Sequence, residues 1–161
     1  METRLNLMET AVGAKVGKRF YATSTALAES SLPKSLQDLL SLRISQINGC
    51  GFCVDIHAKD AAAAGEAALR LHLVAAWQHT TVFTDAERAA LALAEEGTRI
   101  TVPGQTVSDA TWEQARKHFD DEQLAALTCL IALMNASNRM GLMTNSLGGS
   151  YEAGAFAGLE S

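Results

Sequence analysis

Proline is scarce in this chain of 161 residues, where it occurs only at Pro33 and Pro103. Helix breakers are therefore few, and alanine, the best helix former, is frequent. Apolar residues recur at spacings of three and four rather than two, which is typical of helices and not of strands. We therefore predict an all-α fold, a helical bundle of about six to seven helices. With no internal repeat and no linker, residues 1–161 are expected to form a single domain.

Long apolar runs and clusters of basic residues are also absent. The formal net charge is -5 and no stripe of Lys or Arg occurs, which argues against nucleic acid as a partner. The most apolar stretch, near residues 124–134, is much shorter than the roughly 20 residues of a membrane span. Residues 1–7 are charged, so we expect no signal peptide, no membrane association and a cytoplasmic location.

Caps and breaks divide the chain into expected helices. Pro33 ends the first one, Thr84 with Glu87 forms a capping box, and Asp120 with Gln123 forms another. The helices that we expect cover residues 10–29, 36–48, 50–64, 66–77, 86–96, 108–118 and 120–143. The tail from Gly148 is rich in Gly and Ala and yields no firm prediction.

Cysteine is rare as well, and two of the three cysteines stand close together. Cys50 and Cys53 are three residues apart, and His57 follows four residues later, so all three can share one helix face. At a helix start, unpaired N–H groups and the positive end of the helix dipole favour a thiolate on Cys50. His57 can take the proton of Cys53. A nucleophilic thiol, a second sulfur and a proton acceptor together suit thiol redox chemistry.

Other interpretations of the same motif remain open. Zinc could be held with a fourth ligand from elsewhere, but structural zinc sites usually show a second ligand pair, which is missing here. Haem attachment needs His directly after the second cysteine, where Val54 stands. A thioredoxin-like site would lie in alternating strands and helices. The cysteines could also be small packed residues without chemistry.

The segment LLSLRISQINGCGFCVDIHAKDA, Leu39–Ala61, resembles the core of the alkylhydroperoxidase D family, within the carboxymuconolactone decarboxylase-like superfamily. Trp77, the stretch Phe83–Leu91, and Asn138 with its neighbours are similar to later segments of that family. The resemblance covers nearly the whole chain. It implies an all-helical fold that assembles into trimers or hexamers.

The resemblance also implies an activity, which is peroxide reduction through a disulfide between Cys50 and Cys53. Cys53 then attacks the peroxide, Cys50 resolves the product and His57 is the base. The electron donor in the family is dihydrolipoamide on an acyltransferase, so the resemblance implies a dithiol as the partner, such as one on a lipoyl-bearing protein. No metal and no other cofactor is implied. We expect Cys50, at the helix start, to be the more exposed sulfur and the point of attack by the donor.

One departure from the family affects the proton relay. Family members commonly carry Glu twelve residues before the first cysteine, and here Asp38, one methylene shorter, takes that place. Asp38 is the expected relay acid, although it could instead cap the start of its own helix. Phe52 stands where some relatives have a second His.

Two other functions compete with the peroxidase. A decarboxylase of the same superfamily, acting on a lactone carboxylate, has no need of paired thiols. A redox sensor would form the same disulfide to change an interface and would not turn over.

Five further residues complete the expectations. Cys129 lies in an apolar run and is predicted to be a small core residue. Glu95 and Glu96 are predicted to form a solvated face near a helix end. Ser45 and Asn48 are expected to hydrogen-bond the start of the helix that carries the cysteines.

Overall fold

The computed structural model describes residues 2–157, and across these residues it contains helices and no strand. The all-α prediction is therefore confirmed. Seven α-helices are present in this part of the chain, with two short 3-10 helices, η1 (Leu7–Glu9) and η2 (Val74–His79). Their bounds are α1 Ala11–Ala28, α2 Lys34–Asn48, α3 Gly51–Ala63, α4 Ala68–Leu73, α5 Asp85–Thr98, α6 Asp109–Arg116 and α7 Asp121–Met143.

Helix ends follow the caps in the sequence closely. The side chains of Thr84 and Asp120 each accept a hydrogen bond from a backbone N–H in the first turn, and both capping boxes are complete. Helix α2 stops at Gly49, which adopts φ 71°, a left-handed conformation that glycine reaches without strain. The helix expected over residues 66–77 divides instead into α4 and η2, with non-helical backbone at Ala76.

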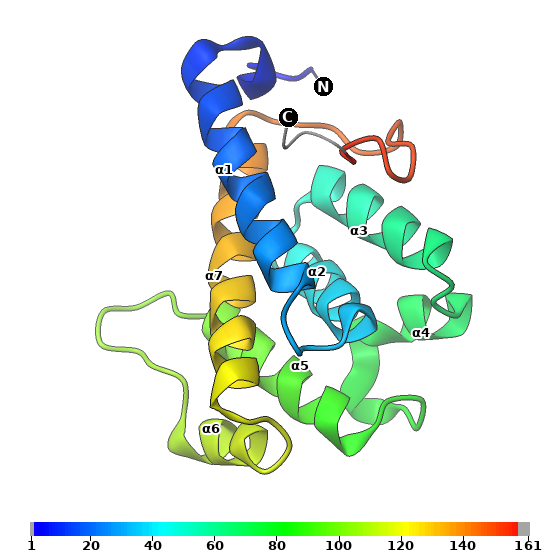
Figure 1. Ribbon diagram of the computed structural model, residues 1–161, viewed down its shortest axis with the longest axis vertical. Coiled ribbons are helices and arrows are strands. Elements are labelled where there is room, and N and C mark those ends of the chain that lie inside the picture. The colour runs from blue at the N-terminus through cyan, green and yellow to red at the C-terminus, as the bar shows by residue number, and fades with distance from the viewer. Residues whose placement is uncertain (1, 158–161) are drawn as a thin grey trace.

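Helix α2 lies at the centre of the fold and packs against α3, α5 and α7. Figure 1 shows α7 along the long axis of the molecule, with α1 beside it and with α3 and α4 on the opposite side of α2. Leucines of α2 such as Leu39 and Leu40 have no exposed surface and join the main hydrophobic core. Because α2 is buried on most of its sides, it has little freedom to move. It therefore holds α3, the helix that carries the cysteines, in a fixed position.

Several buried polar groups of α2 are satisfied by hydrogen bonds, whereas the side-chain oxygen of Gln46 on the same helix is buried without a partner among residues 2–157. Gln37 donates to the carbonyl oxygens of Leu27 and Leu32 at 2.8 and 2.9 Å, and thereby fixes the loop between α1 and α2. The hydroxyl of Ser41 donates to a carbonyl of its own helix at 2.8 Å. These bonds remove most of the cost of burying polar atoms.

Glu95 contradicts the prediction of a solvated face, because only 4% of its surface is exposed. Its carboxylate accepts hydrogen bonds from the Trp77 indole at 2.8 Å, from Arg43 at 2.8 Å and from Arg99 at 2.7 Å. Burial alone would raise the pKa of Glu95, but these three donors together lower it below its ordinary value. Glu95 is thus a buried carboxylate that joins α2, η2 and α5.

Cys129 is exposed on α7, so its prediction as a core residue is wrong. It lines a hollow of about 430 Å³ between α6 and α7, together with Trp112, Leu124, Ala125 and other residues. The apolar run around Cys129 supplies residues to both sides of the helix, and only one side faces the core.

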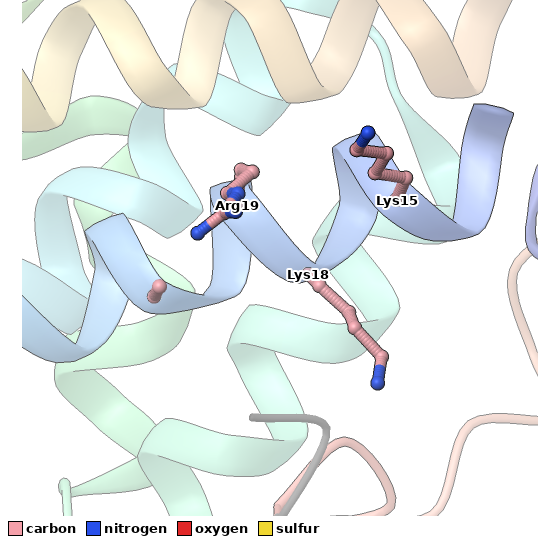
Figure 2. A pocket seen from close by; sticks show the side chains of 4 residues that line it. Lys15, Lys18 and Arg19 are labelled. Carbon is pink, nitrogen blue, oxygen red and sulfur yellow. The ribbon is translucent and has the colours of Figure 1, made fainter. Parts of the chain in front are cut away.

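A second hollow, of about 230 Å³, lies along α1. Figure 2 shows Lys15, Lys18 and Arg19, which line it with Ala22. Neither cysteine of the pair nor His57 lines this hollow. Across residues 2–157, no helix has the length and apolar character that a membrane crossing requires.

Candidate active site

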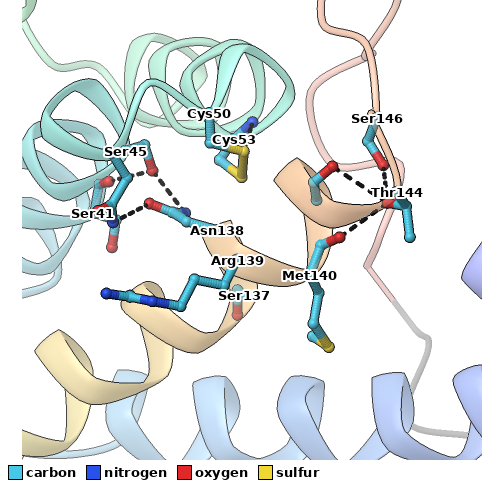
Figure 3. Close-up of a disulfide and its surroundings, with 12 residues drawn as sticks. Ser41, Ser45, Cys50, Cys53, Ser137, Asn138, Arg139, Met140, Thr144 and Ser146 are labelled. Atoms are coloured by element: carbon cyan, nitrogen blue, oxygen red, sulfur yellow. Dashed lines mark hydrogen bonds between the residues drawn. A yellow bond between two sulfur atoms is a disulfide. The ribbon is translucent and has the colours of Figure 1, made fainter. Parts of the chain in front are cut away.

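Cys50 and Cys53 lie at the start of α3 and are joined by a disulfide, with 5.3 Å between their Cα atoms. Cys50 is the N-cap residue, and its sulfur accepts a hydrogen bond from the Cys53 N–H at 3.3 Å. The cysteines thus occupy the position expected from the sequence, within one turn and at the positive end of the helix dipole. Figure 3 shows the two sulfurs with α7 beside them.

Neither sulfur is open to solvent, which contradicts the expectation that Cys50 is the more exposed one. Cys50 is 1% exposed and Cys53 is 6% exposed. The reason is Gly141 on α7, where a Cβ atom would lie 3.3 Å from Cys50 Sγ and 3.7 Å from Cys53 Sγ. A residue without a side chain lets α7 pack directly on the disulfide.

His57 is half-buried on α3, one helical turn beyond Cys53. Burial lowers the pKa of His57 from 6.5 to about 4; nearby Lys34 also lowers this pKa, and Asp60 acts in the opposite direction. The imidazole is therefore neutral at pH 7 in the oxidised protein. A neutral imidazole has a nitrogen lone pair, so it can accept the proton of a thiol.

The low pKa of His57 predicts a pH-dependent stability. Between pH 6.5 and 4 the unfolded chain binds a proton on this imidazole that the folded chain excludes, so stability is complete above pH 6.5 and falls as the pH falls. Because water reaches the half-buried ring, we expect a loss of about 1–2 kcal/mol by pH 5.

Urea unfolding of the wild type and of His57→Gln at pH 7 and pH 5 measures this loss. Glutamine does not titrate, so the drop between the two pH values should be smaller in the variant by that amount. Equal drops in the two proteins would mean that His57 titrates normally in the folded chain.

Asp38 is buried on α2, with 9% of its surface exposed, and Lys34 Nζ donates to its Oδ1. Burial raises the pKa of Asp38, while the bond to Lys34 lowers it and the charges of Asp60 and Glu66 raise it further. No hydrogen bond joins Asp38 to His57 among residues 2–157. The capping interpretation is wrong, because the N-cap residue of α2 is Pro33.

Polar side chains form a layer beneath the cysteines where α2 meets α7. Asn138, with no exposed surface, donates to the Ser45 hydroxyl at 3.2 Å. Asn48 donates to the side-chain oxygens of Asn135 and Asn138, each at 3.0 Å. The side chains of Ser45 and Asn48 therefore bind α7, as Figure 3 shows for Ser45. The expected bond to the start of α3 is made by the Ser45 backbone, whose carbonyl accepts the Cys50 N–H at 3.1 Å. This layer fixes the end of α2 that leads into Cys50.

Metal binding needs several ligand side chains that converge. The part of the chain that the structure describes contains no group of three or more His, Cys, Asp or Glu placed to hold a metal ion. Both thiols of the motif are already engaged in the disulfide.

A match between the sequence model of a protein family and half of the chain shows which family the chain belongs to. The sequence model of the Carboxymuconolactone decarboxylase family matches residues 14–96, which include α2, α3 and both cysteines. The chain belongs to this family. Among similar chains is the uncharacterised protein YdfG of Bacillus subtilis, which is 36% identical over 114 residues, or 71% of this chain and 76% of YdfG.

Solved structures share the fold of this family member. A protein from Agrobacterium tumefaciens, described as of unknown function and as a candidate antioxidant defence protein AhpD, has a TM-score of 0.85 at 30% identity. The likeness covers 93% of this chain and all of that one. An alkylhydroperoxidase AhpD core from Ralstonia eutropha, at 23% identity, has a TM-score of 0.73 over 84% of this chain and 72% of its own. At that identity the likeness shows the fold alone.

Sequence reasoning missed Gly141, which lies inside α7 and packs on the disulfide. It also missed the contact of the tail with α3, where Asp55 accepts the N–H groups of Gly149 and Tyr151. The glycines of the tail are the one available signal, because they let a chain approach other backbone closely.

Proposed function

We propose that this protein is a thiol-dependent peroxidase that reduces hydrogen peroxide or alkyl hydroperoxides in antioxidant defence. The observation that carries the proposal is the Cys50–Cys53 disulfide with His57 one turn beyond it. The disulfide is the oxidised form in such a redox cycle. In the reduced form, a neutral imidazole can accept the proton of a cysteine thiol.

The cycle begins with the reduced protein. His57 accepts the proton of Cys53, and the thiolate attacks the outer oxygen of the peroxide. The O–O bond breaks, the alcohol leaves with a proton, and Cys53 becomes a sulfenic acid. Cys50 then attacks that sulfur, water leaves and the disulfide forms. A dithiol donor supplies two electrons and two protons to restore both thiols, so the cycle needs no metal, haem or flavin.

Family membership and the Agrobacterium relative support this choice. That protein is described as a candidate antioxidant defence protein AhpD and is similar along nearly the whole chain. We further propose a lipoyl-bearing protein as the dithiol donor and a homo-oligomer, trimer or hexamer, as the working form.

Asp38 has a place in this proposal as the acid of the relay. Lys34 binds Asp38, and the charge of Lys34 also acts on His57, so the three groups are close enough to influence one another. The raised pKa of Asp38 helps it to hold and release a proton. Without a direct bond to His57, a proton would pass between them through water.

The relay makes a prediction about paired variants. His57→Gln should lower kcat/KM for hydrogen peroxide by about 10²–10³-fold, which is the usual contribution of a general base. Asp38→Asn should lower it by about tenfold and alter its pH dependence. If Asp38 acts through His57, adding Asp38→Asn to His57→Gln should cause no further loss. Independent, additive losses would contradict the relay.

Two measurements test the proposed function: the consumption of peroxide, and the number of free thiols before and after the reaction. The purified, reduced protein receives one equivalent of cumene hydroperoxide, and peptide mapping locates the thiols that disappear. We expect Cys50 and Cys53 to be lost together and continuous consumption when dithiothreitol is present. A sensor would oxidise once and stop, and a decarboxylase would leave the peroxide untouched.

A further inference from the structure

The base of the proposed cycle, His57, must carry a positive charge during part of each turnover. When it takes the proton of Cys53, the thiol becomes a thiolate and the imidazole becomes an imidazolium, and the proton later leaves with the alcohol. Burial of the ring lowers the pKa of His57 and the charge of Lys34 adds to this effect, whereas the charge of Asp60 opposes it. A negative charge near the ring is therefore needed to favour the protonated form.

Asp60 lies on the same face of α3 as the reacting groups. It follows His57 by three residues and Cys53 by seven, and both spacings return to one side of a helix. Along the helix axis, Asp60 is about 4.5 Å from His57 and about 10.5 Å from Cys53. Its charge therefore acts more strongly on the imidazole than on the thiolate. Asp55 and Lys59, on the opposite side of α3, pair with each other at 2.7 Å.

The charge of Asp60 is not neutralised by a cation. Two neighbouring carboxylates are paired, because Lys34 donates to Asp38 on α2, and Arg70 lies 2.9 Å from Glu66. Asp60, by contrast, forms no ion pair with any residue between 2 and 157, and its hydrogen-bond partners in this range are neutral. A carboxylate without a cationic partner keeps its full charge to act on a neighbouring ring.

The coil after α7 supplies these neutral partners, and Figure 1 shows it beside α3. The Tyr151 hydroxyl lies 3.0 Å from both carboxylate oxygens of Asp60, and the Gly154 N–H donates at 3.0 Å. Burial raises the pKa of Tyr151, and the hydrogen bond to Asp60 and its charge raise this pKa further, so the hydroxyl keeps its proton and donates. These two donors fix the carboxylate without cancelling its charge.

Charged residues of the other elements around α3 are turned to solvent or held elsewhere. In its second half, α7 carries one charged residue, Arg139, which is exposed and donates to the carbonyl and the side chain of Asn135. His72 on α4 and Glu152 in the coil after α7 are exposed. In the part of the chain that the structure describes, Asp60 is thus the carboxylate whose charge favours a proton on the base.

We propose that Asp60 is a positioning residue whose charge stabilises the protonated imidazole of His57, and that Tyr151 and Gly154 hold its carboxylate in place. This deepens the proposed function, in which His57 is the base, and rests on it. The coil after α7 thereby supports the proton transfer from Cys53, through a carboxylate that itself touches neither thiol nor peroxide.

NMR of the oxidised full-length protein, labelled at histidine, measures the ratio of protonated to neutral His57 at pH 4.5. His57→Gln identifies the signal among the four histidines. Asp60→Asn keeps the shape of the side chain but removes its charge, so we expect this ratio to fall about three- to tenfold. Tyr151→Phe leaves the carboxylate free to turn toward water, so the ratio should fall in the same direction but by less. At pH 7, Asp60→Asn should also lower kcat/KM for hydrogen peroxide about three- to tenfold.

Asp55→Asn is the matched control. It removes the same charge from the same helix and keeps an oxygen for the N–H groups of Gly149 and Tyr151, which Asp55 accepts at 2.6 and 3.1 Å. Because Asp55 lies on the side of α3 opposite His57 and is paired with Lys59, the ratio should stay at its wild-type value. Tyr21→Phe, which removes the hydroxyl of the other tyrosine, should also leave the ratio unchanged.

An unchanged ratio in Asp60→Asn would overturn the proposal. An equal fall in Asp55→Asn would overturn it too, because the effect would then follow net charge and not the position of Asp60. A wild-type ratio in Tyr151→Phe would overturn the role of the coil, and this variant decides the test if Asp60→Asn does not fold. Wild-type shifts of the other histidines show that each variant is folded. Because the NMR sample contains no peroxide, a protein that never consumes peroxide would refute the peroxidase, while the ratio still decides whether Asp60 acts on His57.

Discussion

Cys53→Ser eliminates peroxide consumption, with a loss of at least about 10⁴-fold, the scale seen when the nucleophile of a covalent mechanism is removed. Serine keeps the shape of the side chain but its hydroxyl does not ionise near neutral pH and does not attack an O–O bond. Cys53 is 6% exposed and in the helical first turn, so the substitution preserves packing. Peroxide is followed by a colorimetric assay with dithiothreitol as donor.

Cys50→Ser is the matched control and should behave differently. Cys53 can still attack, but no thiol stands at position 50 to resolve the product, so the protein consumes one equivalent of peroxide in the absence of donor. The sulfenic acid on Cys53 should be trapped by dimedone and located by mass spectrometry. If the Cys50→Ser variant is inert, and dimedone instead traps a sulfenic acid on Cys50 in the Cys53→Ser variant, the two roles are reversed. If both variants turn over normally, the thiols are not the reacting groups.

The largest effect on stability is expected at Glu95. Glu95→Ala leaves Arg43, whose side chain is 12% exposed, without the carboxylate that lies 2.6 Å from its guanidinium. Removing one partner of a buried pair typically costs about 3–5 kcal/mol, because the remaining charge stays desolvated. The Trp77 indole also loses its acceptor at 2.8 Å. The melting temperature should fall by about 10 °C.

Thermal unfolding followed by circular dichroism measures this loss, with Glu113→Ala as the control. Glu113 is an exposed carboxylate on α6, so its removal should change the unfolding free energy by less than about 0.5 kcal/mol. Equal melting temperatures for the two variants would mean that the Arg43–Glu95 pair adds nothing to stability. Arg99 forms a second ion pair with Glu95 at 2.7 Å but is mostly exposed, so it contributes little.

Helix positions were predictable because their signals are local. The capping boxes at Thr84 and Asp120 need only residues three positions apart, and both occur as expected. The stop at Gly49 likewise depends on one residue. The division of residues 66–77 into α4 and η2 was not predictable in this way. It accompanies contacts with distant side chains, including the hydrogen bond of Arg88 to the Trp77 carbonyl at 2.9 Å.

Burial of single side chains was harder to predict, because it depends on partners far along the chain. Glu95 follows a pattern typical of an exposed helix end, yet its partner Arg43 lies 52 residues away. Cys129 stands within an apolar run, yet it faces outward. Composition around a residue does not say which side of a helix meets the core.

The candidate site was predictable in the same uneven way. Cys50, Cys53 and His57 lie on one helix, so their spacing was enough to place them together. The roles assigned to them, the relay through Asp38 and the single-domain organisation stay predictions. The residue packed against both sulfurs, Gly141, lies about 90 residues further along the chain. Contacts at such separations leave no periodic trace in a sequence.

Gly141 also lies outside residues 14–96, the part of the chain that the family model matches. Any side chain at position 141 would meet both sulfurs, so the space around the disulfide depends on one residue beyond the matched region.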